Sequence, residues 1–221
     1  MQGAPTPSAA DFAPPHPLQF EGSRLARWVL QCLGWRVTFE GLPAAQGVLI
    51  AYPHTSNWDF VLAMLAKWSI GVPVRFWGKD SLFRIPLFGR WLRWVGGVPV
   101  RRDLAGGVTR QAREIFAQRK ASGTYFWLGL APEGTRSAQP GWRSGFYQTA
   151  VAAQVPLGLV TLDFGRRVVD ATCFIRLSGD PALDMPRIAQ HYQGVVGKIA
   201  ANAAPIQLLD AAPTRSDTAD T

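Results

Sequence analysis

Short apolar runs alternate with longer segments of helical pattern along this chain, and this order constrains its fold more than any other feature. A strand joined through a helix to the next strand is the unit from which layered α/β domains are built. We therefore predict one α/β domain, in which a mixed, largely parallel sheet is flanked by helices. The expected strands are 36–39, 48–52, 74–77, 125–130, 156–161 and 168–176, and the expected helices are 23–32, 57–69, 106–116, 145–153 and 186–202.

The length and the two ends of the chain indicate one folded unit. With 221 residues and a hydrophobic share of 48%, the chain is long enough to bury a single core. The proline-rich residues 1–20 and the Thr/Asp/Ser-rich residues 211–221 are predicted to be flexible tails. The folded domain is therefore expected to span 21–210.

Neither a signal peptide nor a transmembrane helix is expected. The first residues lack a basic region followed by an apolar core, so cytoplasmic residence is the default. The uncharged stretch 144–162 is long enough to span a bilayer. Glycine, glutamine and proline interrupt this stretch, however, and divide it into a helix and a strand.

The charge balance favours anionic partners. Lys and Arg number 23 against 15 for Asp and Glu, which suits phosphate groups, acidic lipid surfaces, nucleic acid or an acidic carrier protein. Nucleic acid is not expected, because the chain has no aromatic RNA-binding signature and no readable helix-turn-helix. Cys32 and Cys173 lie far apart and outside any Cys/His cluster, so we predict two buried thiols, no disulfide and no metal site.

His54 and Asp59 lie five positions apart, directly after the predicted strand 48–52. Reactive groups of α/β sheets gather past the carboxyl ends of strands. A carboxylate that accepts from one imidazole nitrogen orients the ring, and the other nitrogen then serves as a base. The more common explanation of so short a pattern is structural: His54 caps the helix, and Asp59 occupies its first turn because the helix dipole favours an acid there.

Residues Glu133, Gly134, Thr135 and Arg136 follow the predicted strand 125–130 in the same way. A flexible backbone, a hydroxyl and a guanidinium in consecutive positions suit the binding of an anionic oxygen, although the segment alone is also typical of an ordinary turn. The chain has no G-x-S-x-G elbow and no Walker or dinucleotide-binding glycine loop. Covalent serine hydrolysis and nucleotide chemistry are therefore disfavoured.

Together, the His54–Asp59 segment HTSNWD and the Glu133–Arg136 segment EGTR resemble the glycerolipid acyltransferase family in their order and spacing. Further blocks are similar to those of this family: 78–89 with its lysine, 96–102 with its closing arginine, and 145–157. The resemblance covers 48–161 and implies the fold of the glycerol-3-phosphate acyltransferases. The sequence departs from the family pattern at Pro53, Arg101 and Gly158, where Asn, an acidic residue and proline are usual.

The resemblance implies that a fatty acyl group moves from acyl-CoA or acyl-carrier protein to the hydroxyl of a lysophospholipid. The expected acceptor is 1-acyl-sn-glycerol-3-phosphate, in phospholipid biosynthesis, and the thioester is a co-substrate rather than a cofactor. His54 would remove the hydroxyl proton and Asp59 would stabilise the imidazolium, without a covalent enzyme intermediate. The implied substrate-binding residues are Lys79, Arg102, Glu133, Gly134, Thr135 and Arg136.

These six residues have different implied roles. Lys79, Arg102 and Arg136 would hold the phosphate of the acceptor. Backbone N–H groups near Gly134 and Thr135 are candidates for stabilising the tetrahedral oxyanion. Glu133 would brace Arg136 or its loop.

Residues 82–95 interleave aromatic and aliphatic side chains with Arg84, Arg90 and Arg93. This composition is typical of a segment at a membrane interface. Together with the amphipathic helix that carries Trp28, it would dock the enzyme as a peripheral protein on the inner face of the cell membrane. The alternative is that the aromatic rings lie in the core and the arginines are solvated.

Two further functions stay open at this stage. One is acyl transfer to another lysolipid, with an ornithine- or sugar-based acceptor. The other is a non-catalytic basic module that binds anionic membrane or nucleic acid, which the charge balance alone supports.

Overall fold

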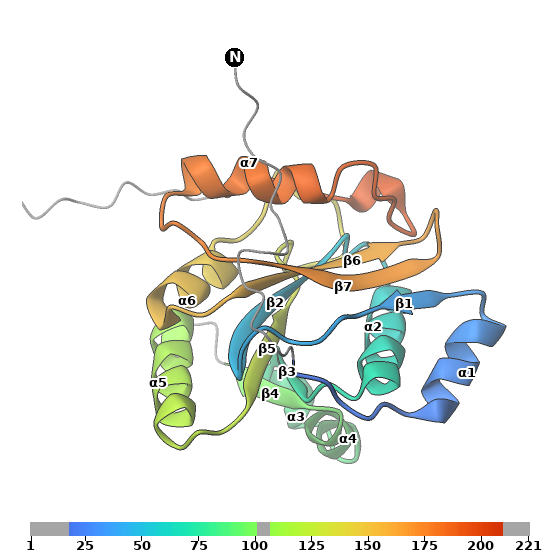
Figure 1. The fold of residues 1–221 in the computed structure, drawn as a ribbon, viewed down its shortest axis with the longest axis horizontal. Coiled ribbons are helices and arrows are strands. Elements are labelled where there is room, and N and C mark those ends of the chain that lie inside the picture. The colour runs from blue at the N-terminus through green and yellow to red at the C-terminus, as the bar shows by residue number, and fades with distance from the viewer. Residues whose placement is uncertain (1–17, 101–106, 210–221) are drawn as a thin grey trace, which may run out of the picture.

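Seven strands form one sheet in the computed structural model, which describes residues 18–100 and 107–209 (Figure 1). Their order across the sheet is β1-β7-β6-β2-β5-β3-β4. Neighbouring strands are parallel except β6 and β7, so β1 and β7 run against the other five. The strands are β1 (Arg36–Thr38), β2 (Gln46–Tyr52), β3 (Val74–Lys79), β4 (Gly97–Val100), β5 (Phe126–Leu130), β6 (Leu157–Asp163) and β7 (Val168–Ile175).

Helices cover both faces of this sheet, so the domain has three layers (Figure 1). Helices α5, α6 and α7 pack on one face around a large apolar cluster, and α1 and α2 pack on the other. The helices are α1 (Arg24–Cys32), α2 (Asn57–Ile70), α3 (Asp80–Phe83), α4 (Phe88–Trp94), α5 (Gly107–Ala121), α6 (Gly145–Ala153) and α7 (Pro181–His191), with a 3₁₀ turn at Ala200–Asn202. The predicted α/β architecture is confirmed.

Strand β2 lies at the centre of the sheet because both of its faces are apolar. Val48, Ile50 and Tyr52 belong to the cluster under α5, α6 and α7, and Leu49 and Ala51 pack on the opposite side. Such continuous hydrophobicity is what a parallel strand covered on both faces requires. The buried strand therefore carries the segment that follows it, residues 53–56, to the carboxyl edge of the sheet.

Gly158 on β6 departs from the family pattern for a packing reason. A Cβ atom at this position would lie 2.4 Å from Leu49 Cδ2 and 2.8 Å from the Phe174 ring. Both distances are shorter than a real contact allows, so a larger residue, proline included, requires the neighbouring side chains to move.

The structure corrects the predicted last helix. Helix α7 is Pro181–His191 rather than 186–202. Asp180 caps it by accepting the N–H of Ala182, and Pro181 occupies the first turn, where proline is tolerated. Pro186 therefore lies inside the helix instead of starting it. Beyond the helix end, Gly194 has a φ of 75°, which turns the chain away.

Residues 82–95 divide between the core and the surface. Phe83, Leu92 and Val95 are buried, whereas the arginines are exposed. The other apolar side chains of the segment are also exposed: Leu82, Ile85, Leu87, Phe88, Trp91 and Trp94. The alternative that the aromatic rings lie in the core therefore holds for Phe83 but not for Phe88, Trp91 and Trp94.

The prediction of two buried thiols is wrong for Cys32, which is exposed, and Cys173 is only half-buried. Helix α1 packs through Ala26 and Leu30, so the stripe that contains Leu25, Trp28 and Cys32 faces solvent. No helix within the described residues combines the length and the apolar character needed to cross a bilayer.

Candidate active site

The segment between β2 and α2 brings the predicted base and acid together. His54 Nδ1 lies 3.5 Å from Asp59 Oδ2. The imidazole is 17% exposed and the carboxylate is fully buried, so only the ring of this pair reaches solvent. With Nδ1 toward the acid, Nε2 lies on the opposite side of the ring.

Asp59 also closes a capping box at the start of α2. Its Oδ2 accepts the N–H groups of Thr55 at 2.6 Å and Ser56 at 2.7 Å, and its Oδ1 accepts the Ser56 hydroxyl. Ser56 Oγ in turn accepts the N–H of Trp58, which makes Ser56 the N-cap residue. The structural explanation of this carboxylate is confirmed, with Ser56 and not His54 as the cap, and the same carboxylate faces the His54 ring.

Glu133 fixes the backbone of His54. Its buried carboxylate accepts the His54 N–H on one oxygen and the Ala204 N–H at 2.9 Å on the other. Burial raises the pKa of Glu133 and these two N–H groups lower it. Because β2 and β5 are neighbours in the sheet, the segments that follow them meet at this point.

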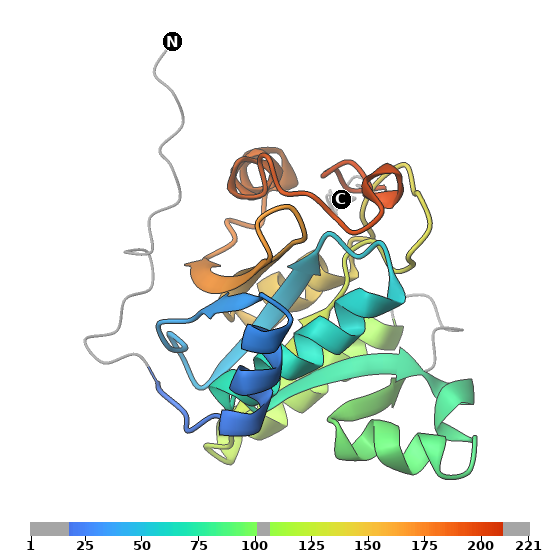
Figure 2. The same cartoon turned by 90° about the vertical axis from the view of Figure 1, so that its right-hand side faces the viewer.

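Residues 199–204, near the C-terminal end of the described chain, form hydrogen bonds with the segment between β2 and α2 (Figure 2). Ile199 N–H donates to Thr55 Oγ1 at 3.2 Å, and the Asn202 side chain donates to the Thr55 carbonyl. Tyr52, the last residue of β2, donates its hydroxyl to the Ala204 carbonyl at 3.0 Å. Sequence reasoning missed residues 199–204, which carry no recognisable motif.

The Gly134–Arg136 turn offers fewer free amides than expected. Gly134 has a φ of 70°, which suits glycine, and its N–H donates to the Ala131 carbonyl at 3.1 Å. The N–H groups of Thr135 and Arg136 have no hydrogen-bond acceptor in the described part of the chain. Arg136 is exposed and has no acidic partner there.

The surroundings of His54 keep its imidazole neutral. Burial lowers its pKa below the ordinary value, the nearby carboxylate of Asp59 raises it, and the positive charge of Arg136 lowers it again. The net shift is downward, so the neutral base predominates at neutral pH. Arg136 therefore lies close enough to His54 to influence its protonation.

The side chains of two predicted phosphate-binding residues, Lys79 and Arg102, lie outside the described part of the structure. Lys79 ends strand β3, and its side chain is outside the described residues. Arg102 lies outside them altogether. Within the described residues no group of three His, Cys, Asp or Glu side chains is arranged to hold a metal ion.

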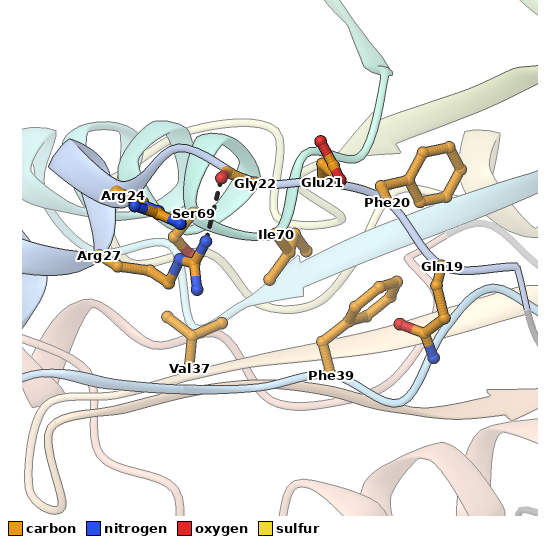
Figure 3. Close-up of a pocket in the computed structure, with 10 residues that line it drawn as sticks. All are labelled: Gln19, Phe20, Glu21, Gly22, Arg24, Arg27, Val37, Phe39, Ser69 and Ile70. Carbon is orange, nitrogen blue, oxygen red and sulfur yellow. Dashed lines mark hydrogen bonds between the residues drawn. The ribbon is translucent and has the colours of Figure 1, made fainter.

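A separate hollow of about 460 Å³ lies at the other end of α2 (Figure 3). Arg24 and Arg27 of α1, Val37 of β1 and Ser69 of α2 are among its lining residues. Arg27 donates to the Gly22 carbonyl at 3.1 Å. None of the predicted site residues lines this hollow.

Comparison with known proteins gives a family match and a distant structural likeness. The family model described as Acyltransferase matches residues 35–162, which is more than half of the chain. A similar solved structure is that of the 1-acyl-sn-glycerophosphate (LPA) acyltransferase PlsC from Thermotoga maritima, with 20% sequence identity, a TM-score of 0.46 and coverage of 73% of this chain and 70% of that chain. A search of curated proteins found no match.

We predict that Arg136→Gln raises the pKa of His54. The substitution removes a positive charge that disfavours the imidazolium, so the ring binds its proton at a higher pH. The pKa is measured by NMR titration of the His54 ring signals. Arg136→Lys, which keeps the charge, serves as the control and should change the pKa less. A pKa that stays constant or falls in Arg136→Gln would contradict this arrangement.

Proposed function

Because the chain belongs to the acyltransferase family, we propose that it moves a fatty acyl group from a thioester donor to the hydroxyl of a lysophospholipid. The donor is acyl-CoA or acyl-carrier protein, and 1-acyl-sn-glycerol-3-phosphate is the acceptor that we propose, as a step of phospholipid biosynthesis. The observation that carries the proposal is the buried Asp59 carboxylate 3.5 Å from a partly exposed imidazole.

His54 acts as the general base in this proposal. Its unprotonated Nε2 removes the proton of the acceptor hydroxyl while the oxygen attacks the thioester carbonyl. Asp59 faces Nδ1, where it orients the ring and stabilises the imidazolium. The thiolate leaves as the tetrahedral intermediate collapses, and it takes up the proton from His54. No bond forms between enzyme and acyl group.

In this proposal, the turn after β5 binds the negative charges of the substrates, together with Lys79 and Arg102. The Thr135 N–H is the proposed donor to the oxyanion, since the Gly134 N–H is already bonded. Arg136 binds the acceptor phosphate, together with Lys79 and Arg102. Glu133 acts on substrate through the His54 backbone that it holds.

We also propose that the enzyme binds an anionic membrane through one face. Exposed apolar side chains lie on α1, α2 and the α4 region, which line one side of the domain (Figure 2). Aromatic contacts join α2 to α4, with the Trp68 and Trp94 rings 6.1 Å apart. This docking face consists of Leu25, Trp28, Leu33, Trp58, Val61, Leu87, Phe88, Trp91 and Trp94.

Charge and position support this docking face. Trp28 is 60% exposed and Trp94 75% exposed, which is unusual for indoles unless they meet an apolar partner. Arg27, Arg90 and Arg93 are exposed on the same elements, and their positive charges would attract anionic lipid headgroups. Trp58 lies in the first turn of α2, so the docking face reaches the active site and gives it access to a lipid acceptor.

The proposed reaction predicts that purified protein releases free thiol from acyl-CoA when a lysolipid is supplied. Among a panel with phosphate, choline, ornithine and sugar headgroups, the phosphate monoester should react fastest. His54→Ala should lower the rate by about 10²–10⁴-fold, because the general base is lost. Thiol release and mass spectrometry of the lipid product measure the reaction. The matched control is His191→Gln, on α7 and outside the site. An unaffected rate in His54→Ala, or no product from any lysolipid, would contradict the proposal.

The docking face predicts that Trp28→Gln with Trp94→Gln weakens binding to vesicles that contain anionic lipid. Loss of two indoles should lower the partition coefficient on the order of tenfold or more. Co-sedimentation with the vesicles measures it. Leu183→Gln is the control, because Leu183 is exposed on α7, across the sheet from the docking face. Equal binding by all three proteins would contradict the proposed face.

A further inference from the structure

A second arginine lies across the active-site turn, and no sequence motif pointed to it. A Cβ atom on Gly134 would lie 2.7 Å from Nε and 2.8 Å from Cδ of Arg143. The Arg143 side chain therefore occupies the space that the side chain of any other residue at 134 would fill. Gly134 permits this close approach, and its φ of 70° also favours glycine.

The backbone of Arg143 is held in place from several directions. Its N–H donates to the Pro132 carbonyl at 2.9 Å, which joins it to the Glu133–Arg136 turn. The preceding residue, Trp142, is fully buried, and its ring lies 5.0 Å from that of Tyr52 at the end of β2. The Trp142 backbone also bonds to Gln207 and Leu209. Arg143 thus projects from a rigid support rather than from a loose loop.

The guanidinium of Arg143 lacks an internal counter-ion. Arg143 is exposed, and within the described residues no carboxylate forms an ion pair with it. The nearest acid in sequence to this turn, Glu133, is already engaged by two backbone N–H groups. Arg136 is exposed and unpaired on the same turn. The Arg143 side chain lies against Gly134, and Arg136 lies two residues further along the same turn, so this turn presents two exposed arginines that have no carboxylate partner within the described residues. Guanidinium groups bind phosphate oxygens through paired N–H donors.

We propose that Arg143 binds a phosphate group of a substrate together with Arg136. This inference rests on the proposed acyl transfer, for which it adds a residue that determines substrate affinity. The phosphate belongs either to the headgroup of the acceptor or to the coenzyme A of the donor, and both present the same oxygen atoms to a guanidinium. Arg143 acts on binding and not on the proton transfer at His54.

The test compares Arg143→Gln and Arg143→Lys with Arg119→Gln, an exposed arginine on α5. The first arm measures the affinity of each protein for inorganic phosphate by NMR titration. The second arm measures KM for lysophosphatidate, monoacylglycerol, acyl-CoA and acyl-carrier protein. We expect Arg143→Gln to weaken phosphate binding and to raise one KM by about tenfold, with kcat nearly unchanged. Arg143→Lys should restore a part of the affinity, and Arg119→Gln should match the wild type.

The two substrate pairs identify the source of the phosphate. A rise in KM for lysophosphatidate but not monoacylglycerol assigns Arg143 to the acceptor headgroup, and a rise for acyl-CoA but not acyl-carrier protein assigns it to the donor. Unchanged phosphate affinity and unchanged KM values would overturn the inference. The binding arm needs no turnover, so weakened phosphate binding in a protein that transfers no acyl group would refute the proposed function and leave the phosphate site standing.

Discussion

The buried carboxylate of Asp59 determines the shape of the site and its chemistry together. One oxygen accepts two backbone N–H groups and faces the imidazole, while the other accepts the Ser56 hydroxyl. Burying a carboxylate is unfavourable unless its oxygens are satisfied, and here the turn itself supplies the donors. Helix α2 therefore begins where the acid can orient His54, so the capping of the helix and the positioning of the base are one arrangement.

The topology of the sheet brings the remaining groups to this turn. Adjacent parallel strands β2 and β5 place residues 53–56 beside residues 131–136, and Glu133 bonds across the gap to the His54 backbone. Residues 199–204 close the other side through Thr55 and Glu133. This last segment lies outside the residues 35–162 that match the family model. The candidate site is therefore held partly by residues beyond the matched region.

Local pattern predicted much of the fold and the contact between His54 and Asp59. Three strands are apolar runs bounded by turn residues, and such runs are recognisable in the sequence: 48–52, 125–130 and 156–161. Helix α6 has its predicted bounds. Helices α3 and α4 were not predicted, because arginines and aromatic rings obscure any period in 82–95. Strand β4 was not predicted either, because it is only four residues long and contains glycine and proline. Pro186 suggested a helix start that Asp180 and Pro181 in fact provide.

Long-range contacts explain what sequence reasoning missed in the site. Ser56 three residues before Asp59 is a recognisable capping box, so that part of the arrangement was readable in principle. The bond from Ile199 to Thr55 spans 144 positions, and the packing of Arg143 on Gly134 depends on how Trp142 is buried. Neither leaves a local signal. The predicted roles of Lys79 and Arg102 stay predictions, because their side chains are outside the described residues.

The rate of acyl transfer by Asp59→Asn tests the central claim most directly. The asparagine oxygen can still accept the N–H groups of Thr55 and Ser56, and its amide can donate to the Ser56 hydroxyl, so the capping box persists while the negative charge is lost. We predict thermal stability close to that of the wild type and a rate lowered by about 10² or more. A folded Asp59→Asn protein that transfers acyl groups at the wild-type rate would show that Asp59 only caps the helix, and the account of the site would be wrong.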